Sequence, residues 1–174
     1  YLRTGVIVLL LVISGIVRTY NIEQSPPALF CDEAAIGVDA HSLWLTGRDH
    51  HGQSWPSLFQ SLGDFKSPMF IYSMVPIVGI FGVSDFNVRF TSVIWSIFGI
   101  AVLATIALFY HSWTAAFWTT ALAATTPWLF HYNRIAFELN SFWPLFLLLV
   151  FVSHKRKNSA EYRTNGDLLN FLLT

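Results

Sequence analysis

The sequence has few charged residues and a single cysteine. Charged residues make up 11% of the 174-residue chain, and 54% of the chain is hydrophobic, whereas soluble domains average about 25% charged residues. This composition excludes an ordinary water-soluble domain. Cys31 is the only cysteine, so an internal disulfide framework and a zinc site built from several cysteines are both excluded. Ten basic residues balance ten acidic ones, so net charge gives no reason to expect a nucleic-acid partner.

Charge is also missing from one long internal stretch, which contains no Asp, Glu, Lys or Arg between residues 90 and 133. At about 1.5 Å per helical residue, this stretch is about twice as long as the roughly 30 Å hydrocarbon core of a membrane. It therefore predicts a helical hairpin with spans at about 90–109 and 114–131. The turn between them is expected at residues 110–113, which read Tyr-His-Ser-Trp.

Two further apolar stretches predict spans, at about 4–18 and 139–153. The first lies between Arg3 and Arg18, whose long side chains can reach the two membrane interfaces. A cleaved signal peptide is the alternative for it, but no small-residue cleavage pattern follows Val17. The last stretch ends at a basic His-Lys-Arg-Lys cluster, which is the best orientation marker in the sequence.

The segment 68–83 is ambiguous. It is apolar but shorter than the roughly 20 residues that a span needs, and Pro76 and Gly79 interrupt it. If this segment crossed the membrane, the chain would have five spans, and Arg3 would lie on the opposite side from the basic cluster. With four spans, both lie on the cytoplasmic side, which the positive-inside rule favours.

The predicted fold is therefore an all-α polytopic protein of the cell membrane, a transmembrane helix bundle with an external loop at 19–89 and a cytoplasmic tail at 154–174. Within the loop, apolar residues at helical spacing predict an interfacial helix at about 33–46, which Gly47 ends. The segment 68–83 is predicted as a second interfacial helix, because a serine and a proline stand at its start.

Four spans would bring the remaining charged residues of interest together near the outer membrane interface. Transfer of a sugar from a lipid phosphate needs a carboxylate to accept the acceptor's proton and cations to stabilise the departing phosphate. Asp32, as the base, and Glu33 are therefore the catalytic candidates. The candidates for substrate binding are Lys66, Arg89, Arg134 and Glu138.

Each candidate also has a structural alternative. Asp32 can act as the N-cap of the helix that follows it, and Glu33 can interact with the dipole of that helix. Lys66 and Arg89 flank apolar segments and can be membrane anchors. Arg134 stands four residues before a glutamate, so the two can form an ion pair along one helical turn.

A metal site and a sugar-stacking ring are further possibilities in the external loop. His50 and His51 follow Asp49, and these residue types bind metal ions. However, Asp49 and Gly52 are more typical of a turn, so no metal ligand is assigned. Trp55 is a candidate for stacking on a sugar ring.

In this order, the residues resemble the GT-C superfamily of membrane glycosyltransferases, in particular the bacterial branch close to protein O-mannosyltransferases and lipid A aminoarabinose transferases. The pair Asp32-Glu33, after a first helix that ends at Arg18, is similar to the acidic motif of the superfamily's first external loop. Residues 64–72 are similar to its Lys-Pro-Pro-Leu-Tyr stretch, whose lysine contacts the lipid phosphate. Ser67 replaces the first proline.

Two later stretches extend the resemblance. Residues 81–92 are similar to the Phe-Gly…Arg-Leu-Pro-Ser segment that opens the second helix; Arg89 is kept, and a threonine stands where the proline is usual. Residues 126–140 are similar to the second external motif, in which an arginine, here Arg134, precedes an acidic residue that faces the active-site cavity, here Glu138.

The resemblance implies that the chain is the amino-terminal part of a longer GT-C-like enzyme. Such an enzyme transfers a sugar from a polyprenyl-phosphate donor to a protein, lipid or glycan acceptor at the outer face of the membrane, with inversion and with Asp32 as the base. No cofactor is obligatory, although some relatives use a divalent metal. Membrane lipid is an expected partner, and nucleic acid is not.

Two rival functions belong to other classes. A lipid-linked-sugar binding or flipping protein would use the same cations to hold phosphate without a catalytic base. A transport or channel subunit is expected to carry charged residues within its spans. The uncharged hairpin argues against the second rival.

Overall fold

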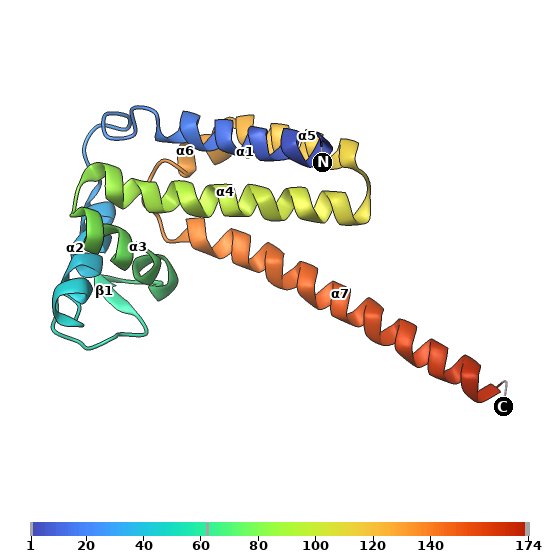
Figure 1. Cartoon of the computed structure of the whole chain (residues 1–174). Coiled ribbons are helices and arrows are strands. Elements are labelled where there is room, and N and C mark those ends of the chain that lie inside the picture. Colours follow the sequence, from blue (N-terminus) through green and yellow to red (C-terminus); the bar gives the residue numbers. More distant parts are fainter. Residues whose placement is uncertain (1, 62, 173–174) are drawn as a thin grey trace.

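The computed structural model describes residues 2–61 and 63–172, of which 157–172 are described as backbone only. The described chain is mostly helical, with one short β-hairpin (Figure 1). In chain order the elements are α1 (Leu2–Thr19), α2 (Cys31–Thr46), β1 (Phe59–Ser61), β2 (Asp64–Lys66), α3 (Pro68–Phe81), α4 (Asp85–Tyr110), α5 (Trp113–Thr125), α6 (Pro127–Tyr132) and α7 (Leu139–Leu172).

The long helices pack side by side, with α4 in contact with α1, α5 and α7 (Figure 1). α1 and α5 run in one direction, and α4 and α7 run in the other. α1 and α4 are each long and apolar enough to cross a membrane. The turn expected at residues 110–113 is confirmed, since α4 ends at Tyr110 and α5 begins at Trp113. Ser112 caps α5 by accepting a hydrogen bond from the backbone N–H of Ala115.

Two of the expected spans differ from the prediction. The segment 114–131 is not one continuous helix, because Pro127 disfavours the helical conformation at Thr126, whose ψ is 119°. α5 therefore ends at Thr125, and α6 is a separate short helix. The helix expected at 139–153 continues to Leu172 as α7, so the predicted tail at 154–174 is helical through its described part, and residues 173–174 lie outside the described residues.

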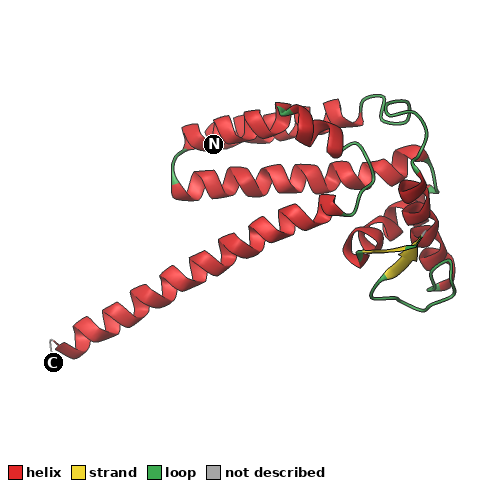
Figure 2. Cartoon of the chain, turned by 180° about the vertical axis from the view of Figure 1, so that it is seen from behind, coloured by secondary structure: helices red, strands yellow, loops and turns green. Residues whose placement is uncertain are grey.

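A second layer gathers at the end of the bundle where α4 begins. There α2, α3 and the β-hairpin pack together, as Figure 2 shows. The hairpin pairs Phe59 with Lys66 in antiparallel register, and it was not predicted, because strands of three residues carry little pattern. The buried core of this layer includes Ile36, Ala40, Leu43, Phe70, Ile71, Met74, Val78 and Val88.

The two residues expected to interrupt the segment 68–83 do not break it, because α3 is one continuous helix. α3 runs through Pro76 from Pro68 to Phe81. At Gly79, an added Cβ would lie 2.1 Å from Cδ2 of Trp44 on α2. Gly79 therefore allows the indole ring to lie directly against the α3 backbone, and the absent side chain lets α2 and α3 approach closely.

The ends of α2 and α3 are set largely by the residues expected. Gly47 ends α2 with a φ of 69°, a left-handed conformation that favours glycine. Ser67 is the N-cap residue of α3, although its side chain makes no capping hydrogen bond. The alternative role of Asp32 as the N-cap of α2 is contradicted: Phe30 occupies that position, and its backbone N–H donates to Oε2 of Glu33 at 3.0 Å. The Asp32 side chain is thus not used as the cap.

Candidate functional site

Asp32 and Lys66 form an ion pair at the surface of the second layer. Oδ1 of Asp32, in the first turn of α2, lies 3.2 Å from Nζ of Lys66, the last residue of β2. The Asp32 side chain is 28% exposed, whereas that of Lys66 is 6% exposed. An accessible carboxylate is therefore held beside a lysine whose side chain is buried.

Two more carboxylates surround the same ammonium group. Oδ2 of Asp64 lies 3.4 Å from Nζ of Lys66. Glu138, just before α7, accepts a hydrogen bond at Oε2 from the backbone N–H of Ser67 at 3.1 Å. We call these four side chains, Asp32, Asp64, Lys66 and Glu138, the Lys66 cluster. Its members come from α2, the β-hairpin and the segment before α7, so only the tertiary fold brings them together.

The cluster shifts the pKa values of its members. Burial lowers the pKa of Lys66, but hydrogen bonds and attraction from Asp32, with further contributions from Glu138 and Asp64, outweigh burial and raise that pKa above its usual value. Lys66 is therefore cationic at neutral pH. Burial raises the pKa of Glu138, against the opposing effects of the Ser67 N–H and the Lys66 charge, and the charges of Asp64 and Asp32 raise it further.

Asp64 is the member of the cluster that the sequence analysis missed. It is 73% exposed, and its pKa is lowered, chiefly by a hydrogen bond from the Phe65 backbone N–H and then by Lys66. A carboxylate two residues before a lysine gives no sign of a role by itself. In a strand, however, residues i and i+2 share a face, which was the available signal.

The raised pKa of Lys66 predicts slow chemical modification. In detergent-solubilised full-length protein at pH 8, acetic anhydride is expected to acetylate Lys66 more slowly than the exposed Lys155, because only the neutral amine reacts. Asp32→Asn is expected to increase the Lys66 rate, since it removes the main attraction that raises the pKa. Peptide mass spectrometry measures both rates. An unchanged Lys66 rate in Asp32→Asn would contradict the pairing.

Glu33 lies in the interior, where its carboxylate accepts hydrogen bonds from a side chain and from the backbone. It is 2% exposed, and its carboxylate accepts hydrogen bonds from Nε and Nη2 of Arg89, both at 3.0 Å. The backbone N–H groups of Phe30 and Ala136 also donate to it, at 3.0 and 2.8 Å. These contacts join α2, α4 and the segment before α7. Glu33 does not reach the Lys66 cluster through any hydrogen bond among the described residues.

Arg89 is wholly buried and uses all of its donors within the protein. Besides the two bonds to Glu33, Nη1 donates to the carbonyls of Ile22 and Pro26 at 2.8 and 2.7 Å, and Nη2 donates to that of Ala28 at 2.5 Å. Arginine has five N–H donors, and all five are engaged. In this arrangement Arg89 has no donor left for a phosphate, so it organises the loop after α1.

Arg134 has the same kind of role at the end of α1. Its five N–H donors engage the carbonyls of Val17, Tyr20, Asn21 and Ser25 at 2.8 to 3.4 Å. The ion pair with Glu138 along one helical turn is not formed, because residues 133–138 are not helical. Burial, and then the charge of Arg89, lower the pKa of Arg134. Arg134 therefore stabilises the C-terminal end of α1 and the chain that leaves it.

The histidine pair at residues 50–51 belongs to a turn, as expected. Oδ1 of Asp49 accepts hydrogen bonds from the backbone N–H groups of His51 and Gln53, at 3.0 and 2.7 Å. His50 binds Asp39 instead, with Nδ1 and Oδ1 2.5 Å apart. Among the residues that the structure describes, no three His, Cys, Asp or Glu side chains gather as a metal site. Trp55 is 66% exposed and stacks on Tyr72 with 5.8 Å between the ring centroids.

Comparison with known proteins identified no relative of the chain. No family model, no curated protein and no solved structure matches the chain.

Proposed function

We propose that the chain is part of a membrane glycosyltransferase that moves a sugar from a polyprenyl-phosphate donor to an acceptor at the outer face of the membrane. The observation that carries the proposal is the Lys66 cluster, in which the accessible carboxylate of Asp32 lies 3.2 Å from a buried ammonium group. A base and a phosphate-binding cation are the two groups that this reaction requires. They occur here side by side, and Asp32 is free from helix capping.

In the proposed reaction, Asp32 takes the proton of an acceptor hydroxyl as its oxygen attacks the anomeric carbon of the donor. The new bond between oxygen and carbon forms while the bond from that carbon to the phosphate oxygen breaks, with inversion. Lys66 stabilises the negative charge that develops on the departing polyprenyl phosphate. Glu138, beside Ser67, positions Lys66 through its charge.

The remaining candidates take supporting roles in this proposal. Glu33 and Arg89 form a buried ion pair at 3.0 Å that fixes the first turn of α2, from which Asp32 projects. Arg134 holds the end of α1. Because the N–H donors of Arg89 and Arg134 are all engaged within the protein, Lys66 remains as the phosphate-binding cation, in place of the three cations expected from the sequence.

We propose four membrane crossings, with the Lys66 cluster outside. Two helices, α1 and α4, are candidates by length and composition. α5 and α6 together cover 113–132, about 30 Å of helix at 1.5 Å per residue, and α7 runs beside α4. The direction of these helices supports the proposal, since it brings the α1 end, the α4 start and the α7 start to one side (Figure 1).

Thiol labelling tests this topology. Cys31 is exposed and lies beside Asp32, so an impermeant maleimide is expected to label it in intact cells that express the full-length protein. In a Cys31→Ser background, His111→Cys, in the turn after α4, is expected to stay unlabelled until the cells are opened. Labelling of both positions in intact cells, or of neither, would refute the proposed arrangement.

The function is tested with membranes that contain the full-length protein. They are incubated with a panel of radiolabelled polyprenyl-phosphate sugars, and membranes from cells without the gene serve as the control. Transfer of label to an acceptor fraction is expected with at least one donor. Binding of a donor without transfer would instead favour a binding or flipping protein, and neither binding nor transfer would refute the proposal.

A further inference from the structure

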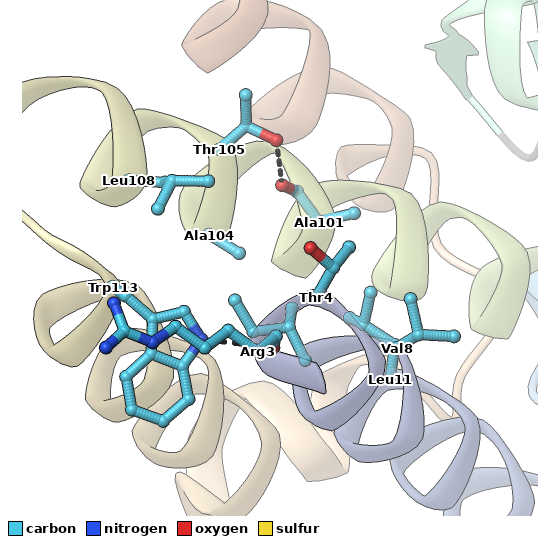
Figure 3. A pocket seen from close by; sticks show the side chains of 10 residues that line it. Arg3, Thr4, Val8, Leu11, Ala101, Ala104, Thr105, Leu108 and Trp113 are labelled. Atoms are coloured by element: carbon cyan, nitrogen blue, oxygen red, sulfur yellow. Dashed lines mark hydrogen bonds between the residues drawn. The ribbon is translucent and has the colours of Figure 1, made fainter. Parts of the chain in front are cut away.

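A groove lies between α1 and α4, toward the end of the bundle where α1 begins. Its volume is about 490 Å³. Figure 3 shows Thr4, Val8 and Leu11 of α1 facing Ala101, Ala104 and Leu108 of α4, with Arg3 and Trp113 together at one end. The two alanines keep the α4 side shallow, so the groove is a narrow apolar channel that ends at a cation.

The end of the groove is ordered by contacts between α1 and α5. Nε1 of Trp113 donates a hydrogen bond to the Arg3 carbonyl at 3.0 Å. The Arg3 guanidinium lies over the indole ring, 5.8 Å from its centroid, which is a cation–π arrangement. Within the described part of the chain, the guanidinium makes no ion pair or hydrogen bond, and Arg3 is exposed, so its N–H donors are accessible to a ligand.

Among the side chains that the structure describes, acidic residues occur at one end of the bundle only. At the other end, where α1 begins and α4 ends, the described charged side chains are the basic residues Arg3, Lys155 and Arg156. Of these three, Arg3 lines the groove. Lys155 lies over the ring of Phe109, the neighbour of Leu108, at 5.6 Å. The described acidic side chains all belong to the segments at the opposite end, and they are Glu23, Asp32, Glu33, Asp39, Asp49, Asp64, Asp85 and Glu138.

We propose that this groove binds an anionic phospholipid, with one acyl chain between α1 and α4 and the phosphate on Arg3. The apolar walls can pack against an acyl chain by van der Waals contact, as apolar helix surfaces do within a membrane. The basic end accounts for the preference for an anionic headgroup. The proposal rests on the membrane location of the chain but not on sugar transfer, since the groove lies at the other end from the Lys66 cluster.

Native mass spectrometry of the purified full-length protein tests the site. The protein, in detergent, is mixed with equal amounts of dioleoyl phosphatidylglycerol and dioleoyl phosphatidylcholine. Retention of phosphatidylglycerol is expected to exceed that of phosphatidylcholine several-fold. Arg3→Gln is expected to reduce phosphatidylglycerol binding about fivefold, the effect of one cation at an anionic surface, and Arg3→Lys is expected to keep most of it. Thr105→Phe, which fills the groove, is expected to reduce binding without a change in charge.

Arg48→Gln is the matched control, because Arg48 is an exposed arginine beyond α2 at the opposite end of the molecule. It is expected to bind phosphatidylglycerol like the unmodified protein. Equal retention of the two lipids, or equal effects of Arg3→Gln and Arg48→Gln, would overturn the proposal. Unchanged binding in Thr105→Phe would overturn the placement of the acyl chain in the groove. Thermal unfolding of each variant shows whether it is folded. If Arg3→Gln is misfolded, lipid binding by Arg3→Lys and Thr105→Phe tests the proposal.

Discussion

Asp32→Asn is expected to reduce sugar transfer by about 10²- to 10⁴-fold, the usual contribution of a general base. The amide has nearly the same shape as the carboxylate but cannot accept the proton of the acceptor hydroxyl. Asp32 is 28% exposed and does not cap α2, so the protein is expected to fold normally. The measurement is the initial rate of transfer by the full-length protein at matched expression, with the donor found active in the panel.

Asp64→Asn is the matched control for this experiment. Asp64 also lies within ion-pair distance of Lys66, at 3.4 Å, but it is 73% exposed. Removing an exposed pair of this kind has a small effect, so transfer is expected to stay within about fivefold of the unmodified protein. If neither variant loses transfer, Asp32 is not the base. If both variants lose transfer equally, the charge around Lys66, and not proton transfer, is the feature that matters.

Arg89→Met is expected to destabilise the folded protein by about 3–5 kcal/mol, the typical cost of removing one partner of a buried ion pair. The change leaves the buried carboxylate of Glu33 without its cation. It also leaves the carbonyls of Ile22, Pro26 and Ala28 without their donor. Unfolding by sodium dodecyl sulfate in mixed micelles, followed by tryptophan fluorescence, measures the change in the free energy of unfolding.

Two further variants test whether the loss of stability in Arg89→Met comes from its buried ion pair with Glu33. Arg48→Met removes an exposed arginine and is expected to have an effect below about 0.5 kcal/mol. The double variant Glu33→Met with Arg89→Met is expected to be less destabilised than the sum of the two single variants, because no lone buried charge remains. Normal stability of Arg89→Met would contradict the supporting role and return Arg89 to the phosphate-binding candidates.

These two experiments distinguish the roles of the two adjacent acidic residues in the first turn of α2. Asp32 and Glu33 are neighbours in sequence, but successive residues of a helix point about 100° apart. Asp32 faces Lys66, and Glu33 faces the interior and Arg89. Loss of transfer with normal stability is therefore expected at position 32, and loss of stability at position 33.

The sequence by itself determined the features that depend on nearby residues. The run without charge and the turn at 110–113 predicted α4 and the start of α5, and Gly47 and Ser67 marked the end of α2 and the start of α3. These features are local, because a left-handed glycine or a proline at the first helical position acts within one turn of the chain. The break at Pro127 is equally local, and the uniform apolar composition around it concealed it.

Only the tertiary structure decided which charged residues are available for chemistry. Arg89 and Arg134 look as suitable for phosphate as Lys66 does in the sequence, yet carbonyl groups from the chain after α1 engage their donors. The carbonyl of Ile22 belongs to a residue 67 positions from Arg89, and that of Tyr20 to a residue 114 positions from Arg134. Whether a guanidinium is satisfied depends on such distant backbone groups, which no local pattern encodes, and the same long-range packing leaves Asp32 and Lys66 together at the surface.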